Sequence, residues 1–306
     1  MSSSLPDGFA IRPARDDEAP AVAELMNAYD DAMAGGEAVS ADDVRDGWRK
    51  LGGDGGAWLV ETPGGSHAGY FELFGRLHEL HLDGYVHPGF TGRGIGTAIV
   101  RRGEARAREL GAPRLLSGTL AQDKPARLLF EAEGWSLERV FYRMRAELDG
   151  PQPEPAPPPG GLVLRTFEPS DAEAFHAATE EAFADHWDFH PEPFADFRAR
   201  TIDAAGFDPT LWWLVLDGDE VAATIRCTWK RFGMGWINML AARRPWRRRG
   251  LGELLLRTAF AEFARRGETR VGLGVDAESE TGATRLYERA GMHVVFQANI
   301  FQKELA

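Results

Sequence analysis

The two halves of this 306-residue chain repeat one another in the same order. "FAIRPARDDEAPAVAELMNA" is similar to "LVLRTFEPSDAEAFHAATEEAF", "GRGIGTAIVRRGEARARELG" to "RRGLGELLLRTAFAEFARRG", and "ARLLFEAEGW" to "TRLYERAGM". The matching positions 12 and 165, 94 and 250, and 130 and 287 lie 153, 156 and 157 residues apart. Self-similarity at a nearly constant spacing indicates copies of one structural unit. We therefore expect two domains of the same fold.

A proline-rich stretch, "DGPQPEPAPPPGG" at 149–161, divides these halves. Its six prolines are incompatible with a helix or a central strand and are typical of a stiff, extended linker. The sequence thus predicts an N-terminal domain at 1–148 and a C-terminal domain at 162–306.

The pattern of the second half predicts a mixed α/β fold. Strands are expected at 162–167, 211–217, 220–230, 235–245 and 269–278, with one or two more at 292–305. Helices are expected after position 171 and at 193–205, 250–266 and 282–291. Such an order gives a mixed sheet with helices on both faces.

Composition restricts the partners and the compartment. The net charge of −12 argues against nucleic acid, whose binding depends on broad phosphate neutralisation. The sequence contains no apolar run of about 18 residues, and "MSSSLPDGFAIRPARDDEAP" has no signal-like apolar region. The single cysteine, Cys227, excludes an internal disulfide and a cysteine-based zinc site, and its apolar strand predicts a buried, inert thiol. We expect a cytoplasmic protein without metal, as a monomer or homodimer.

The stretch "RRPWRRRGLGELL" at 243–255 concentrates positive charge where a helix begins. Five arginines fall within 243–249, although the chain has 47 Asp and Glu against 35 Lys and Arg. A helix N-terminus offers unpaired N–H groups and attracts anions. The dinucleotide fingerprint fails here, because Ile99 and Leu255 stand at its third glycine, and no P-loop Gly-Lys-Ser/Thr follows.

Arg247-x-x-Gly250-x-Gly252 resembles the acyl-CoA loop of the GCN5-related N-acetyltransferases (GNAT), R/Q-x-x-G-x-G/A. The order of elements and the duplication extend this resemblance to nearly the whole chain. The resemblance implies two tandem domains, each a mixed, mostly antiparallel sheet, and acetyl-CoA as cosubstrate. In the family, the loop's amides hold the CoA pyrophosphate, and the strand before it, 236–242 here, pairs with pantetheine. The CoA-binding residues that it implies are Leu240, Ala242, Arg247, Arg248, Arg249, Gly250, Leu251 and Gly252, with Val86, Arg93, Gly94, Gly96 and Thr97 in the first copy.

Two simpler interpretations of the arginines stay open. The whole basic helix start could face only solvent. Arg243 and Arg244 could likewise be solvated, or they could meet a ribose 3′-phosphate of CoA.

The two copies differ at the residues to which the resemblance assigns the chemistry. A family tyrosine that protonates the departing thiolate matches Tyr287, whose phenol, with an ordinary pKa of about 10, stays protonated at neutral pH. The alternative is a tyrosine that only packs in the core. The first copy has Phe130 in its place, and Thr91 where the family prefers Arg or Gln. We therefore expect a degenerate first domain that can bind CoA but does not catalyse.

Among tandem members, the organisation is similar to that of the mycothiol synthases, which use a strand glutamate as the base. The matching position here is Trp236, which puts both the base and a mycothiol-type acceptor in doubt. Asn238 holding a water, or Glu278 or His186 acting through one, are the alternatives.

The stretch "ADHWDFHPEPFADF" at 184–197 lies where the family binds its acceptor. Aromatic rings beside carboxylates suit a cationic amine, and the substrate residues predicted are Trp187, Trp236 and Asn238. The alternative is an aromatic plug with solvated acids; the carboxylates in question are Asp185, Asp188 and Glu192. His186 and His190 stand four apart, but no further metal ligand is implied.

The resemblance predicts transfer of acetyl from acetyl-CoA to a primary amine of a small molecule, in the C-terminal domain. A protein amine is the second substrate class. The rival function is a non-catalytic acyl-CoA-binding module or sensor. Tyr287 favours the enzyme, whereas the missing glutamate favours the sensor.

Overall fold

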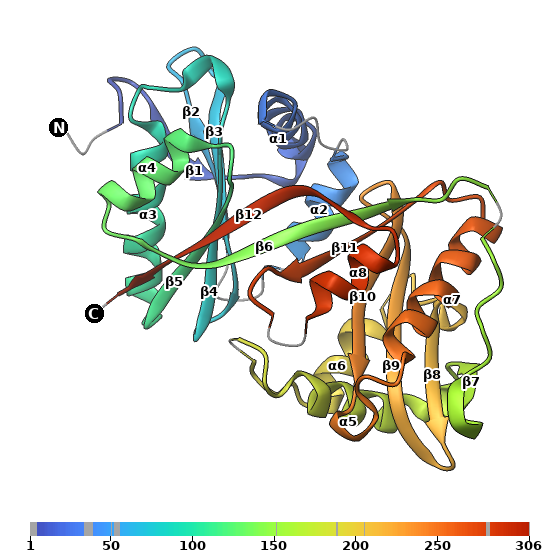
Figure 1. Ribbon diagram of the computed structural model, residues 1–306. Coiled ribbons are helices and arrows are strands. Elements are labelled where there is room, and N and C mark those ends of the chain that lie inside the picture. The colour runs from blue at the N-terminus through green and yellow to red at the C-terminus, as the bar shows by residue number, and fades with distance from the viewer. Residues whose placement is uncertain are drawn as a thin grey trace. The chain divides into compact units, whose positions relative to one another are not determined.

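The computed structural model describes residues 5–33, 39–49, 51, 56–150, 152–187, 189–204, 206–279 and 282–305. The chain forms two compact units, one of residues 1–141 with 296–306 and one of residues 142–295. Each unit contains a mixed sheet with helices on both faces (Figure 1).

The first unit has the strand order β1-β2-β3-β4-β5-β12. Its neighbouring strands pair antiparallel, except β4 and β5, which run parallel. Its elements are β1 (Ala10–Pro13), η1 (Asp16–Glu18), α1 (Ala19–Met33), α2 (Ala41–Arg49), β2 (Gly56–Glu61), β3 (His67–Arg76), β4 (Glu79–Val86), η2 (Pro88–Phe90), α3 (Ile95–Leu110), β5 (Arg114–Leu120) and α4 (Lys124–Ala132), with parts of β6 (Ser136–Glu147) and β12 (His293–Glu304).

The second unit has the order β6-β11-β10-β9-β8-β7. Strands β7 to β10 pair antiparallel, and β10 pairs parallel with β11. Its elements are η3 (Pro159–Gly161), β7 (Val163–Thr166), η4 (Pro169–Asp171), α5 (Ala172–Phe183), α6 (Phe194–Thr201), η5 (Pro209–Leu211), β8 (Trp212–Asp217), β9 (Glu220–Arg231), β10 (Met234–Ala242), η6 (Arg244–Trp246), α7 (Leu251–Arg265), β11 (Arg270–Asp276) and α8 (Ala283–Arg289). The predicted fold class is thus confirmed.

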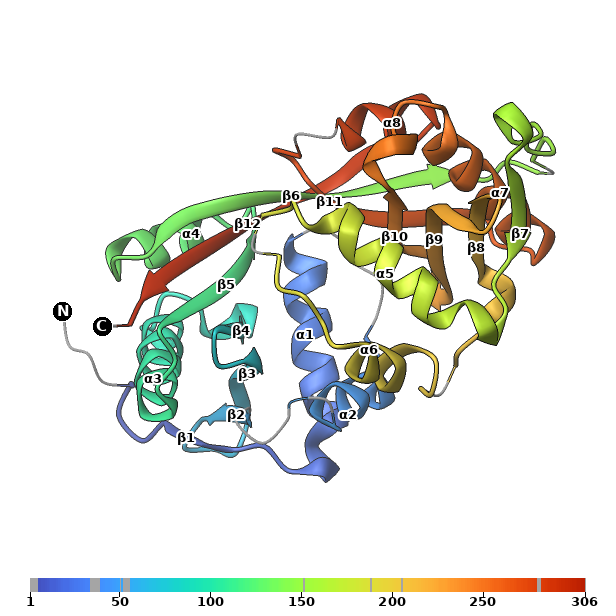
Figure 2. The same ribbon diagram turned by 90° about the horizontal axis from the view of Figure 1, so that it is seen from below.

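Helices cover both faces of the second unit's sheet (Figure 2). Helices α5 and α6 lie against one face and α7 and α8 against the other. Thr179 of α5 contacts Thr224 of β9, whereas a Cβ at Gly235 of β10 would meet Phe263 of α7. The sheet is therefore covered on both sides, which explains why β8 is apolar from Trp212 to Leu216 and why β9 is buried from Val221 to Ile225.

Each unit is completed by a strand segment from the other half of the chain. Residues 298–304 of β12 pair antiparallel with 114–120 of β5, and Leu305 N donates to Pro113 O at 2.9 Å. Residues 142–147 of β6 belong to the second unit, where Leu148 N donates to Thr269 O at 2.8 Å. The compact units therefore differ from the ranges 1–148 and 162–306 at these two segments. The predicted domain roles stay a prediction.

Candidate active site

Strands β10 and β11 separate before they end. Their parallel pairing runs from Gly235 with Val271 to Ile237 with Leu273, but β10 continues to Ala242. Beyond Ile237, the described backbone of β10 thus has no β11 partner along this edge. Backbone N–H and C=O groups without a strand partner are strong hydrogen-bonding sites and can pair with an extended ligand. The first unit has the same feature, because its β4–β5 pairing stops at Leu82 with Ser117.

A β-bulge interrupts β10 at this opening. The pairing with β9 shifts register between Ile237 and Met239, which leaves Asn238 outside the ladder. The Asn238 side-chain oxygen accepts a hydrogen bond from the Thr228 hydroxyl at 2.7 Å. Strand β4 of the first unit pairs with β3 without a shift from Val86 to Glu79. Bulges are frequent beside active sites, so the two units differ here in a functionally relevant feature.

The loop before α7 has the same backbone conformation as its counterpart before α3. Arg248 and Gly250 are left-handed, with φ of 62° and 81°, and so are Gly92 and Gly94, with φ of 74° and 80°. Left-handed residues in such a turn make successive N–H groups converge, and convergent N–H groups bind anions. Arg248 holds this conformation without the freedom of glycine, which costs backbone strain.

The second glycine of each loop packs closely against a leucine of the next helix. A Cβ at Gly252 would lie 2.7 Å from Leu286 of α8, and one at Gly96 would lie 3.0 Å from Leu129 of α4. A side chain at either position would force the facing leucine side chain to move. Gly252 therefore has a structural role in addition to any approach of a ligand. Leu251 is a core residue, 2 % exposed.

Three of the five arginines are engaged within the fold. Arg243 pairs with Glu181 at 2.6 Å, and Arg244 pairs with Asp185. The guanidinium of Arg247 donates to the carbonyls of Ala242 at 3.1 Å and Ala182 at 3.0 Å. These contacts fasten the loop to the end of α5.

Arg248 and Arg249 are exposed and form no hydrogen bond or ion pair with the residues that the structure describes. The charge available to an anion is therefore that of these two side chains. Arg93, Gly94 and Thr97 border the equivalent loop, where the Arg93 guanidinium lies 5.2 Å from the centroid of the Phe90 ring.

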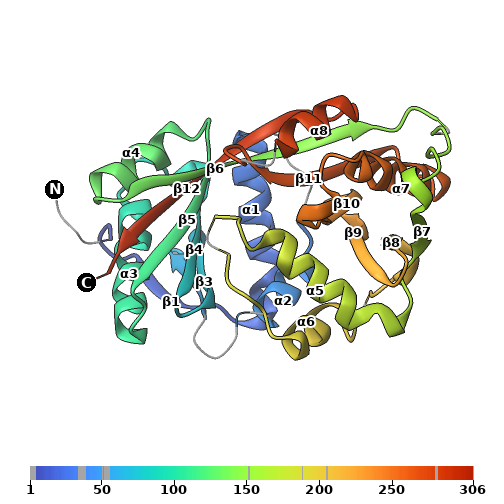
Figure 3. The ribbon, with the colours of Figure 1, turned by 60° about the horizontal axis from the view of Figure 1, so that its bottom comes forward.

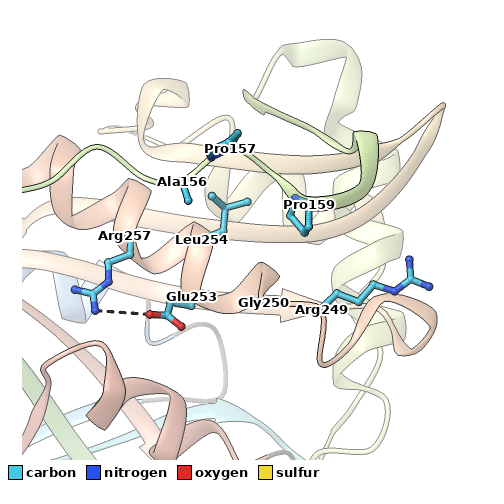
Figure 4. A pocket seen from close by; sticks show the side chains of 8 residues that line it. All are labelled: Ala156, Pro157, Pro159, Arg249, Gly250, Glu253, Leu254 and Arg257. Atoms are coloured by element: carbon cyan, nitrogen blue, oxygen red, sulfur yellow. Dashed lines mark ion pairs between the residues drawn. The ribbon is translucent and has the colours of Figure 1, made fainter.

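A cavity of about 260 Å³ adjoins the start of α7 (Figure 4). The proline-rich segment forms one wall, and the helix forms the other. An ion pair of 3.7 Å between Glu253 and Arg257 lies along the helix side. The lining residues are Ala156, Pro157, Pro159, Arg249, Gly250, Glu253, Leu254 and Arg257. The segment predicted as a linker thus packs against the glycine loop, which its sequence did not reveal.

Tyr287 and Phe130 occupy matching positions on α8 and α4. Tyr287 is 8 % exposed, and burial raises the pKa of its phenol to about 12. Phe130 stacks on Phe301 with ring centroids 5.2 Å apart. Both are well-packed aromatic residues, but only Tyr287 carries a proton that can be donated.

The predicted acceptor segment has its carboxylates paired. Asp185 pairs with Arg244, and Glu192 pairs with Arg200 at 2.6 Å. Asp188 lies outside the described residues. These pairings remove much of the negative charge that favoured a cationic amine. Trp187 follows the end of α5.

The residues considered as a general base differ in their burial and contacts. His186 is half-buried, and burial lowers its pKa although the charge of Asp276 opposes this shift. Glu278 donates its backbone N–H to Asp276 Oδ1 at 2.9 Å. Trp236 is 8 % exposed and packs edge-on against Phe232. A lowered pKa keeps His186 neutral and able to accept a proton near pH 7.

Sequence reasoning missed Arg226, a half-buried side chain of β9. The signal was present in "EVAATIRCTWK", because an arginine there stands between Ile225 and Cys227 in the middle of a largely buried strand.

Within the described ranges, no three His, Cys, Asp or Glu side chains gather in a way that could hold a metal ion. The described helices are also too short or too polar to cross a membrane.

Comparison with known proteins identifies the family of this chain. The acetyltransferase (GNAT) family matches residues 22–135 and 173–292. The chain belongs to this family. It is accordingly an acetyl-CoA-dependent N-acetyltransferase with two GNAT copies, as the repeat predicted.

Relatives in the GNAT family span most of the chain. The mycothiol acetyltransferase of Salinispora arenicola is 32% identical over 69% of this chain and 71% of its own length. That of Thermomonospora curvata is 35% identical over 67% and 68%. The crystal structure of a GCN5-related N-acetyltransferase from Sphaerobacter thermophilus is 35% identical, with a TM-score of 0.84 over 99% of this chain and 97% of that one. A tandem GNAT protein from the clavulanic acid biosynthesis pathway shares the fold, at 17% identity, 97% and 99% coverage and a TM-score of 0.76.

Proposed function

We propose that this acetyltransferase modifies a primary amine of a small molecule and that the reaction takes place in the C-terminal domain. The observation that carries the proposal is the bulge at Asn238, beside the open edge of β10. The bulge turns backbone groups of β10 out of the β9 ladder where the edge toward β11 opens. The first unit has the open edge of β4 without a bulge.

The loop and its surroundings fit acetyl-CoA. The open edge of β10 near Leu240 and Ala242 suits the amide groups of pantetheine. The convergent N–H groups from Arg249 to Gly252 suit a pyrophosphate, and the free guanidinium groups of Arg248 and Arg249 supply its countercharge. Arg247, bound to two carbonyls, positions the loop instead of contacting phosphate. The cavity walled by Pro157 receives the nucleotide end.

Tyr287 stabilises the thiolate that leaves. The amine nitrogen attacks the thioester carbonyl carbon, negative charge passes to oxygen, and the C–S bond breaks as that charge moves to sulfur. The phenol, with a pKa of about 12, stays protonated at every working pH and donates a hydrogen bond to the sulfur. Full proton transfer to an ordinary thiolate, of pKa about 8.5, is uphill. The contribution of Tyr287 is therefore electrostatic.

The proton released by the amine needs an acceptor. We assign this role to His186, through a water molecule, because its lowered pKa keeps the imidazole neutral. Asn238 and Glu278 stay as alternatives. In the first unit, Phe130 cannot donate a hydrogen bond, so we assign that unit CoA binding without catalysis.

The partners proposed are acetyl-CoA and a small amine, without nucleic acid, on a monomer or homodimer. The cytoplasm, which supplies CoA thioesters, is the proposed location. Thiol release from acetyl-CoA, measured with a panel of amines, tests the function. We expect release that depends on one class of amine. Tight binding of acetyl-CoA with no release above the rate in water would instead indicate a sensor.

A further inference from the structure

Arg226 lies on the face of β9 that α5 covers. Side chains alternate along a strand, and its neighbours two residues away fix the face. Thr224 contacts the Thr179 hydroxyl of α5 at 3.1 Å, and Thr228 donates to Asn238. The Arg226 guanidinium carbon lies 5.6 Å from the centroid of the Trp212 ring on the adjacent strand. Figure 3 shows α5 running along this side of β8, β9 and β10.

The Arg226 guanidinium has no anionic partner among the described residues. Its Nε is buried without a hydrogen-bond acceptor, and none of its N–H groups bonds to a residue in the described ranges. Burial lowers the pKa of Arg226 to about 10. An uncompensated charge in such a place is costly, and buried donors in native proteins are almost always satisfied. The fold therefore holds a half-buried cation whose Nε has no acceptor in the described ranges.

The surrounding charges do not neutralise it. Arg200 and Arg231 act on Arg226 repulsively. Glu192 attracts it, but both oxygens of that carboxylate are held by Arg200, at 2.6 and 3.0 Å. Cys227 points to the opposite face, where burial raises the pKa of its thiol and keeps it neutral. The local field is positive and favours an anion.

Arg226 is also adjacent to the proposed reaction centre. Its backbone pairs with Met239 of β10, the residue that follows the bulge at Asn238. Directly paired residues of antiparallel strands have Cα atoms about 5 Å apart. The backbone of Arg226 thus lies directly beside the bulge.

We propose that Arg226 binds a carboxylate of the acceptor. The acceptor class is then an amine that also carries a free carboxylate, such as an amino acid or a compact derivative. The planar guanidinium can hold a carboxylate through two parallel hydrogen bonds, which fixes the direction of the amine. This assignment rests on the proposed function, because it uses the same face of β10.

The test compares each amino acid with its carboxamide, which removes the negative charge and keeps the amine. Thiol release from acetyl-CoA gives kcat/KM for both, with glucosamine as an amine that has no carboxylate. We expect the free acid of at least one pair to exceed its amide by about 100-fold or more, the usual loss when one partner of a buried charge pair is removed.

Arg226→Met should abolish this preference. The kcat/KM of the acid should fall about 100-fold, that of the amide should change less than about threefold, and Arg226→Lys should recover part of the loss. Arg198→Met is the matched control, since Arg198 is an exposed arginine of α6 paired with Asp203 at 3.2 Å. It should leave both values unchanged, and acetyl-CoA affinity by calorimetry should be equal in all four proteins.

Stability separates a ligand-binding role from a structural one. Because Arg226→Met removes a half-buried charge whose Nε has no acceptor, its Tm should equal or exceed that of the wild type. A fall of more than about 5 °C would show that Arg226 supports the fold and would overturn the assignment.

The activity results can also overturn it. Equal use of acids and amides, or preference for glucosamine, would contradict the carboxylate assignment alone. Acetyl-CoA binding without thiol release for any amine of the panel would contradict the proposed function and, with it, this assignment. Failure of the wild type to bind acetyl-CoA would contradict the proposed function and, with it, this assignment.

Discussion

Single side chains distinguish the two copies where their backbones agree. Tyr287 and Phe130 differ by one hydroxyl at matching positions in two similar cores. Tyr287→Phe should keep the packing and the acetyl-CoA affinity but lower kcat by about 100- to 1000-fold, the usual cost of removing one donor to developing charge. Steady-state kinetics and calorimetry check both values. Turnover like that of the wild type would show that the phenol is only a core residue.

Glu72 gives the first unit an unusual pH dependence. Burial raises the pKa of its carboxyl from 4.5 to about 7, and its cross-strand neighbour is Asp83. Since the folded pKa exceeds the unfolded one, the stability contribution is complete below pH 4.5 and is lost as pH rises through 7. Glu72→Gln should remove this loss and raise the free energy of unfolding at pH 8 by at most about 3 kcal/mol. Urea unfolding at pH 5 and 8 measures it; an equal effect at both values would contradict the assignment.

At the scale of elements, the loop before α7 carries a charged side chain at a position with a strained backbone conformation. Arg248 is left-handed where the first copy has Gly92. Arg248→Gly should relieve strain and raise the free energy of unfolding by up to about 1 kcal/mol. The same change should weaken acetyl-CoA binding about tenfold, because it removes one charged contact. Parallel urea titration and calorimetry test this; a variant that loses stability would show that the left-handed turn carries no strain.

The elements that could be predicted from the sequence are those whose signals are local. Glycines and apolar periodicity are enough to predict α7 and its start at Gly250, which is the N-cap of that helix. The ion pairs of Arg243 and Arg244 were not predictable, because Glu181 and Asp185 stand 62 and 59 residues earlier in the chain. The bulge at Asn238 also depends on a partner strand and has no local code.

At the scale of the whole molecule, the sequence did not predict that the two units exchange strand segments. The reason is that β6 and β12, at the ends of the two halves, have similar strand patterns. Residues 1–148 alone lack Phe301 and Leu305, which are 1 % and 6 % exposed in the first unit's core. They also leave the β5 edge unpaired. This fragment should therefore lack a cooperative unfolding transition. The same fragment joined by a flexible linker to residues 293–306 should regain one.

Circular dichroism during thermal unfolding distinguishes the two fragments. If the 1–148 fragment unfolds cooperatively at the temperature of the intact chain, the exchanged strand does not stabilise the first unit.

We propose that acetyl transfer takes place at the second glycine loop. Its test is kcat/KM for acetyl-CoA in two full-length variants. The first variant carries both Arg248→Glu and Arg249→Glu, and the second carries Arg93→Glu in the first loop. All three side chains are exposed, so the fold should persist. We expect a loss of about 100-fold or more in the first variant, from two charge-assisted contacts, and little change in the second. Full activity of the first variant with loss of activity in Arg93→Glu would contradict it.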